Sequence, residues 1–268
     1  MKKDQSKDNK REWTDEDILR LRKSIRSAVE NINFTSPKAV EFYKEADKLR
    51  ENGQHEEAVK LYKEAIKIAP KFAAAWYNKA LSYTHLRNRD GAIEALRKST
   101  EADPSIAQTW NTLGGLLCGG IFVSRETYEE ALGCFRKALE IDPTYEMALN
   151  NLGLVLAKLD RYDEGIEAYR HLTEIRTNHE DWYMLGQMSL GANRYEEAET
   201  AYRKAIELRP DFAYAWGALG QVFLEIGDLD EAEKMMRKSI ELKPDDPTCR
   251  EGLKVVLDQK RGYYGPSE

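Results

Sequence analysis

The sequence predicts an all-α protein built from repeated helix–turn–helix units that stack on one another. The first observation is a fixed period, since Trp182 and Trp216 are 34 residues apart, as are Pro210 and Pro244. The second is that each period holds two stretches whose apolar residues recur every three or four positions, which is typical of amphipathic helices. The third is that a turn separates the two stretches and a proline follows the second. Such units bury their apolar faces only by stacking, so the pattern predicts an α-solenoid.

Residues 213–246 show the pattern most clearly. The first helix is expected at about 213–225, and Gly227-Asp228 breaks the chain after it. The second helix is expected at about 230–242. Pro244 stops it, because a proline ring disfavours helix in the preceding residue.

Six copies in shared register are expected over residues 39–246. Their approximate bounds are 39–72, 73–106, 107–145, 146–178, 179–212 and 213–246. The third copy is longer by about five residues, which fall within 118–128. The fourth is one residue short, and it carries Gly165 and Thr177 where other copies have Ala and Pro.

Further segments are expected on either side of the repeats. Residues 1–14 are charged and predicted to be disordered. Residues 15–36 contain an amphipathic helix that packs on the first repeat, joins a partner or second copy, or lies on a membrane surface. Residues 247–261 predict a helix that covers the last repeat, followed by a frayed tail at 262–268.

The composition argues against several classes of protein. A net charge of −6 argues against nucleic-acid binding, which depends on lysine and arginine neutralising phosphates. No window approaches the ~18 consecutive apolar residues that a membrane span needs, and the N-terminus does not resemble a signal peptide. The three widely spaced cysteines predict small buried residues, not disulfides or a metal site. A cytoplasmic protein is the expectation.

The sequence Trp-x-x-Leu-Gly, followed by an aromatic residue or Leu and then by Ala, an aromatic residue, Ala and Pro, resembles the tetratricopeptide repeat. Trp216, Leu219, Gly220, Ala232 and Pro244 carry it in the sixth copy. The resemblance implies a right-handed superhelix whose first helices line a concave groove. It also implies that the chain binds a protein or peptide segment in that groove. From the residues themselves, no catalysis, cofactor or metal is expected.

The resemblance assigns function to first-helix residues that point into the groove. The predicted partner-binding residues are Tyr43, Lys44, Tyr77, Asn78, Asn111, Thr112, Asn150, Asn151, Tyr183, Gln187, Tyr214 and Gln221.

Two groove asparagines, Asn78 and Asn151, occupy equivalent slots with Thr112 between them. Because an amide both donates and accepts, such a row can pair with the backbone of an extended peptide. The alternative is that these are ordinary solvated residues. A clamp for a C-terminal carboxylate, known in this family, is not expected. Such a clamp needs cations, and only Asn78 fits among the matching positions Tyr43, Asp47, Asn78, Gln108 and Thr112.

The inserted segment carries Ile121, Phe122 and Val123. These apolar residues either fold back on the array or form a contact with a partner. Ser124 is expected to cap a lengthened helix after the insertion.

The sequence holds no phosphate-binding loop and no nucleophile motif. Its histidines are not at metal-ligand spacing from one another or from a cysteine. A non-enzymatic scaffold or adaptor that binds a partner peptide is therefore the leading hypothesis. Two alternatives remain: a structural protein that self-associates through residues 15–32 or the inserted turn, and a regulatory subunit of an enzyme complex.

Overall fold

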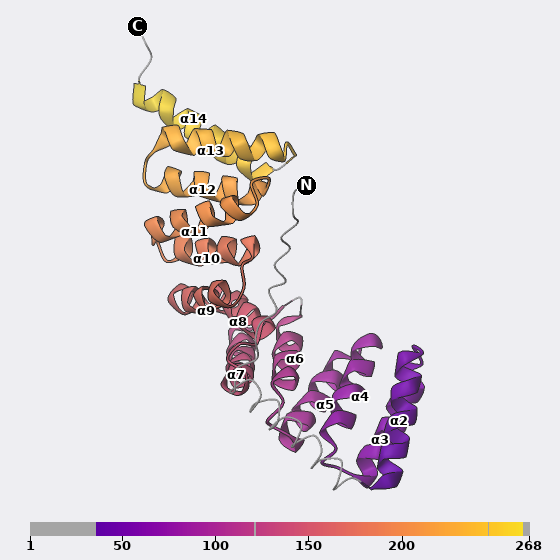
Figure 1. Cartoon of the computed structure of the whole chain (residues 1–268). Coiled ribbons are helices and arrows are strands. Elements are labelled where there is room, and N and C mark those ends of the chain that lie inside the picture. The colour runs from indigo at the N-terminus through magenta and orange to yellow at the C-terminus, as the bar shows by residue number, and fades with distance from the viewer. Residues whose placement is uncertain (1–35, 121, 246, 265–268) are drawn as a thin grey trace, which may run out of the picture. The chain divides into compact units, whose positions relative to one another are not determined.

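The computed structural model describes residues 36–120, 122–245 and 247–264. Within these ranges the chain forms thirteen α-helices and no strand, which confirms the predicted all-α solenoid (Figure 1). The helices are α2 (Pro37–Glu51), α3 (His55–Ile68), α4 (Ala73–His85), α5 (Arg89–Ala102), α6 (Ala107–Cys118), α7 (Arg125–Ile141), α8 (Glu146–Lys158), α9 (Tyr162–Ile175), α10 (His179–Gly191), α11 (Tyr195–Leu208), α12 (Ala213–Glu225), α13 (Leu229–Leu242) and α14 (Pro247–Tyr264). The tail and helix predicted at the N-terminus fall almost wholly outside the described residues.

The chain divides into two compact units, Met1–Leu116 and Leu117–Glu268, here termed the N-terminal unit and the C-terminal unit. In the N-terminal unit, α2 packs on α3, α3 on α4 and α4 on α5. In the C-terminal unit, each helix from α7 to α13 packs on the next helix of the chain. Each unit therefore consists of helices in tandem.

Small residues let the two helices of a repeat approach closely. A Cβ added to Gly153 would lie 2.4 Å from the ring of Tyr169, and one added to Gly186 would lie 2.5 Å from the ring of Tyr202. Both tyrosines are fully buried. The glycines of first helices thus make room for the aromatic side chains of second helices.

The turn inside each of five repeats contains one residue in the left-handed conformation. These residues are Gly53, Arg87, Asp160, Asn193 and Gly227, with φ between 57° and 83°. The amide of the following residue then bonds back to the preceding helix, as Asp228 does to the Phe223 carbonyl at 2.9 Å. This shared turn explains how the sequence Gly227-Asp228 ends α12.

Tryptophan indoles secure the connection from one repeat to the next. The Nε1 atoms of Trp76, Trp110 and Trp216 donate to the carbonyls of Pro70, Pro104 and Pro210 at 2.8, 2.9 and 2.9 Å. Each bond links the start of a first helix to the end of the preceding second helix. The Trp and Pro of the sequence pattern are therefore hydrogen-bond partners that fix the connection between successive repeats.

The fourth repeat departs from this pattern at two positions. At Gly165, an added Cβ would lie 2.8 Å from the sulfur of Met188, so the methionine occupies space that an alanine would fill. Beside Thr177, Arg176 bonds the carboxylate of Asp181 at 2.6 and 2.9 Å and that of Glu146 at 2.8 Å. Ion pairs therefore secure the turn in which Thr177 replaces the proline.

The insertion lengthens the repeat at α7, as predicted. Ser124 Oγ accepts a hydrogen bond from the Thr127 amide at 3.2 Å and caps this helix of 17 residues. Phe122 is 97% exposed, so this residue does not fold back on the array.

The last helix, α14, packs on α13 and buries Val256 completely. Lys260 Nζ pairs with Asp230 at 2.6 Å and Glu233 at 2.7 Å on α13. The helix ends at Tyr264 and so includes Gly262, where the frayed tail was expected to begin. A glycine near a helix end costs only about 1 kcal/mol, which the preceding packed turns tolerate.

Candidate functional site

The first helices of neighbouring repeats contact each other directly. These contacts join α2 to α4 in the N-terminal unit and α10 to α12 in the C-terminal unit. In each unit separately, we call the surface of these first helices the first-helix face: α2 and α4 in the N-terminal unit, and α8, α10 and α12 in the C-terminal unit. It carries most of the predicted partner-binding residues, and each unit is described separately.

In the N-terminal unit, a network of polar side chains centres on Asp47 of α2. Its Oδ1 atom accepts from Arg50 Nε at 3.0 Å and NH2 at 2.8 Å, from Tyr62 OH at 3.1 Å and from Asn78 Nδ2 at 3.0 Å. Asn78 Nδ2 also donates to Tyr43 OH at 2.9 Å. Burial, together with the Asp47 charge, raises the pKa values of Tyr43 and Tyr62, so both phenols stay neutral.

This network includes Asn78, one of the two asparagines that were predicted to pair with a peptide backbone. The Asn78 amide nitrogen already joins two residues of the preceding repeat, so Asn78 connects α4 to α2. Asn111 is buried and only 7% exposed. The structure thus buries Asn111 and bonds half-buried Asn78 to the preceding repeat.

The other predicted residues of the N-terminal unit remain accessible to different degrees. Lys44 is exposed on α2, while Tyr77 and Thr112 are half-buried. Tyr77 OH and Thr112 Oγ1 lie 3.4 Å apart, which brings α4 and α6 together at this point.

In the C-terminal unit, all six predicted residues lie on α8, α10 and α12. The side-chain oxygen of Asn150 accepts from Tyr169 OH at 3.2 Å, and Asn151 is half-buried. Gln187 Nε2 donates to Tyr183 OH at 2.7 Å on α10. The sixth repeat contributes Tyr214 and Gln221.

Tyr214 and Gln221 also have partners within their own repeat. Lys243 Nζ donates to Tyr214 OH and lies 4.2 Å from the centre of its ring, an arrangement typical of a cation–π contact. Gln221 Nε2 donates to Glu225 Oε1 at 2.6 Å. Tyr214 is nevertheless 47% exposed, so much of its ring faces solvent.

Two further apolar residues of this face were not predicted from the sequence. Met147 and Leu154 of α8 are 56% and 42% exposed. They lie seven residues apart, which places them on one side of a helix, with Asn151 between them. The sequence could have identified them, because Met147 and Leu154 are four and three residues from Asn151, and residues at these spacings share a helix face.

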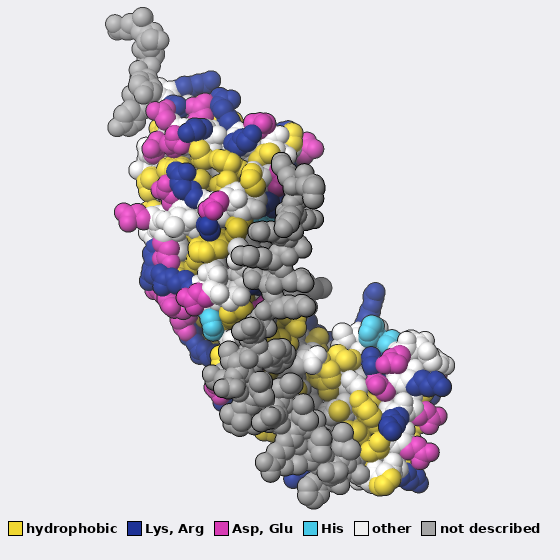
Figure 2. All heavy atoms as spheres, in the orientation of Figure 1, with side chains coloured by type: hydrophobic (Ala, Val, Ile, Leu, Met, Phe, Trp, Pro, Cys, Tyr) yellow, Lys and Arg dark blue, Asp and Glu magenta, His cyan; other side chains and the backbone are white. Residues whose placement is uncertain are grey.

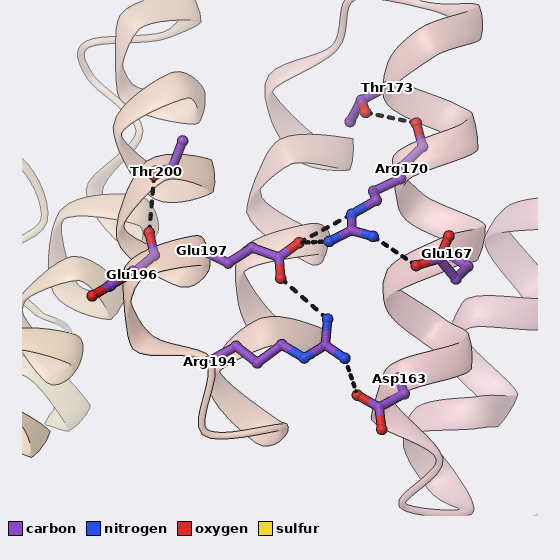
Figure 3. A network of polar contacts seen from close by, with 8 residues as sticks. All are labelled: Asp163, Glu167, Arg170, Thr173, Arg194, Glu196, Glu197 and Thr200. Carbon is purple, nitrogen blue, oxygen red and sulfur yellow. Dashed lines mark hydrogen bonds and ion pairs between the residues drawn. The ribbon is translucent and has the colours of Figure 1, made fainter.

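The second helices carry a different kind of surface. Figure 3 shows Arg170 of α9 bonded to Glu197 of α11 at 2.7 Å and to Glu167 at 2.6 Å. Arg194 bonds Asp163 at 2.7 Å and lies 3.5 Å from Glu197. On the face shown in Figure 2, acidic and basic side chains are likewise interspersed. The charges on α9 and α11 thus pair with one another.

Two histidines that are distant in the sequence meet in the N-terminal unit. The rings of His55 and His85 are stacked, with centroids 4.3 Å apart and planes within 5°. Desolvation and the neighbouring His85 lower the pKa of His55 below its ordinary value. The sequence gives no signal for this contact, because it depends on how α3 packs against α4.

The described residues offer no cluster of three or more His, Cys, Asp or Glu side chains that could hold a metal ion. In the same part of the chain, no helix is long and apolar enough to cross a membrane. Cys134 and Cys249 are buried, Cys118 is half-buried, and none of the three forms a disulfide within the described residues.

Models of the tetratricopeptide repeat match residues 43–105 and 183–247, residues 119–160, and residues 144–211. Among curated proteins, the chain is similar to Hsp70-Hsp90 organizing protein 1 of Glycine max, at 30% identity over 45% of this chain and 21% of that protein. It is also similar to the BBSome complex member BBS4 of Bos taurus, at 26% identity over 69% of this chain and 36% of that protein. A third match is the protein O-mannosyl-transferase TMTC3 of Homo sapiens, at 28% identity over 60% of this chain and 18% of that protein. The chain thus spans only 18% to 36% of the length of these relatives.

Solved structures show the same fold at low sequence identity. YrrB, a TPR protein with an unusual peptide-binding site, aligns with a TM-score of 0.63 at 23% identity, over 72% of this chain and 97% of that one. The C-terminal part of a TPR repeat-containing protein from Cytophaga hutchinsonii aligns with a TM-score of 0.64 at 18% identity, over 83% and 87%. The family models match most of the chain, and they show that it belongs to the tetratricopeptide repeat family, whose members mediate protein–protein interactions.

Proposed function

We propose that the chain is a non-enzymatic scaffold that binds a peptide segment of a partner protein on the first-helix face of its C-terminal unit. The observation that carries the proposal is the exposure of three large apolar side chains, Met147, Leu154 and Tyr214, on α8 and α12. Exposed apolar side chains that gather on one face favour an interaction surface. Half-buried Asn151, Tyr183 and Gln187 add hydrogen-bonding groups to the same face.

The chemistry of this face indicates the kind of segment that it binds. Apolar side chains of the partner would pack against Met147 and Leu154, and peptide groups would pair with amide and phenol side chains. On α9 and α11 of the second-helix surface, by contrast, the charges are already paired with one another. The proposal therefore assigns binding to the first helices.

The experiment begins with a phage-displayed library of random dodecapeptides, selected on the immobilised full chain. An enriched peptide is synthesised, and its affinity is measured by fluorescence anisotropy. Replacing Met147 and Leu154 together by Lys is expected to weaken binding by at least about tenfold, because two buried apolar contacts are lost. Both side chains are exposed in the free protein, so the melting temperature should change little.

The matched control replaces Leu208 and Ile226 by Lys. These residues are 37% and 49% exposed in the same unit, but they lie at the end of α11 and in the turn after α12. The control adds the same charge and should retain wild-type affinity within about twofold. Equal losses in both variants, or no loss in the first, would refute binding on the first-helix face.

A further inference from the structure

Repeats 1 and 5 pack the same three aromatic rings together at equivalent positions. Tyr43, Tyr62 and Phe72 of the N-terminal unit correspond to Tyr183, Tyr202 and Phe212 of the C-terminal unit, each 140 residues further along the chain. The two tyrosine rings are 6.0 Å apart in repeat 1 and 5.7 Å apart in repeat 5, tilted by 49° in both. The phenylalanine lies 4.9 Å and 5.2 Å from the first tyrosine, respectively.

In repeat 1, the protein satisfies the buried phenol of this cluster itself. Tyr62 OH donates to the Asp47 carboxylate at 3.1 Å. That carboxylate also accepts from Arg50, which compensates its charge, and from Asn78 of the next repeat. The hydroxyl of Tyr62 therefore has an acceptor, and the acceptor has its own partners.

All three of these supporting residues are replaced in repeats 5 and 6. Gln187 stands in place of Asp47, Leu190 in place of Arg50, and Ala218 in place of Asn78. The amide nitrogen of Gln187 donates to Tyr183 OH at 2.7 Å. Repeat 5 has thus lost both the carboxylate and the amide of the next repeat.

The hydroxyl of Tyr202 is a hydrogen-bond donor that lacks an acceptor among the described residues. The Tyr202 side chain is fully buried. The equivalent Tyr169 of repeat 4 donates to Asn150 at 3.2 Å. Buried polar groups are paired in the great majority of native proteins, so an unpaired one needs an explanation.

The chemistry of the site restricts what can pair with this hydroxyl. Burial raises the pKa of Tyr202, with a smaller contribution from Tyr183, so the phenol remains a neutral donor that requires an acceptor. With Leu190 where Arg50 stands in repeat 1, this position supplies no cation to compensate a carboxylate. The matching acceptor is therefore an uncharged carbonyl oxygen.

We propose that Tyr202, Tyr183 and Gln187 form a subsite that takes the amide carbonyl of an Asn or Gln side chain of the bound peptide. The carbonyl reaches Tyr202 OH as the Gln187 side chain turns away from Tyr183 and donates to the ligand instead. This subsite rests on the proposed function, because Tyr183 and Gln187 lie on the first helix α10, while Tyr202 belongs to the second helix α11 of the same repeat.

The test compares Tyr202→Phe with Tyr169→Phe, using the peptide enriched on the wild-type chain. Tyr202→Phe is expected to weaken peptide binding by about five- to tenfold while the melting temperature stays equal or rises, because the removed hydroxyl has no partner in the free protein. Tyr169→Phe removes a hydroxyl that is bonded within the protein. It should lower the melting temperature and leave affinity within about twofold.

A double-mutant cycle identifies the carbonyl. Each Asn or Gln of the peptide is replaced by Ala, and one of these replacements should weaken wild-type binding but not weaken binding to Tyr202→Phe any further. Equal affinity of wild type and Tyr202→Phe would overturn the subsite and leave the binding face intact. An enriched peptide without an essential Asn or Gln would also overturn it, whereas no enrichment at all would refute the proposed function and the subsite together.

Discussion

Two glycines of the C-terminal unit have opposite surroundings. Gly153 on α8 faces the ring of fully buried Tyr169, whereas a Cβ added to Gly133 on α7 would meet nothing within 4 Å. The first glycine is required by packing. The second only adds flexibility to a helix.

Gly153→Ala is expected to destabilise the protein by about 1–3 kcal/mol, because its methyl group would collide with an aromatic ring. Gly133→Ala is expected to stabilise it by about 0.5–1 kcal/mol, because alanine loses less backbone entropy in a helix. Urea unfolding followed by circular dichroism measures both changes. A neutral Gly153→Ala would show that the ring of Tyr169 can move aside without cost.

For single residues, the sequence predicts close packing better than it predicts hydrogen bonds between repeats. Gly153 follows from the repeat pattern, which is local and recurs along the chain. The bond from Asn78 to Asp47 does not, because it joins residues of two repeats and depends on which side chain fills one position. The exposed Met147 and Leu154, by contrast, could have been predicted, because they share a helix face with Asn151.

At the scale of helices, two arginines of the C-terminal unit make ion pairs of different kinds. Arg176 bonds the carboxylate of Asp181, which is only 2% exposed, through two nitrogens. Arg194 bonds Asp163, whose side chain is 75% exposed. Removing a partner costs much more when the remaining charge is buried.

Arg176→Gln is expected to lower the free energy of unfolding by about 2–3 kcal/mol, because it leaves the buried Asp181 carboxylate without its cation. Arg194→Gln should cost less than about 1 kcal/mol, as is usual for exposed pairs. Urea unfolding of the two variants gives the comparison. Similar losses in both would show that Asp181 finds other partners or is more hydrated than its burial indicates.

The pair formed by Arg176 and Asp181 also shows why departures from a pattern resist prediction. Thr177 in place of proline is visible in the sequence. The compensating bonds to Asp181 and Glu146 depend on the approach of α8 and α10, so they follow from the packed structure.

For the whole molecule, the fold class and family were predictable because the same signals for helix, turn and helix end recur in each repeat. Six similar copies reduce the effect of any single departure, such as Gly165 or the insertion before Ser124. Function is less predictable, since it depends on the residues in which the copies differ. Gln187, Leu190 and Ala218 of repeats 5 and 6 are such residues.

The central claim is that a partner peptide binds to the first helices of the C-terminal unit. Hydrogen exchange followed by mass spectrometry, on the full chain with and without the selected peptide, tests it most directly. We expect slower exchange in α8, α10 and α12, where the bound peptide restricts local opening, with little change in the second helices α9, α11 and α13. Slower exchange confined to the second helices, or to the N-terminal unit, would contradict the claim.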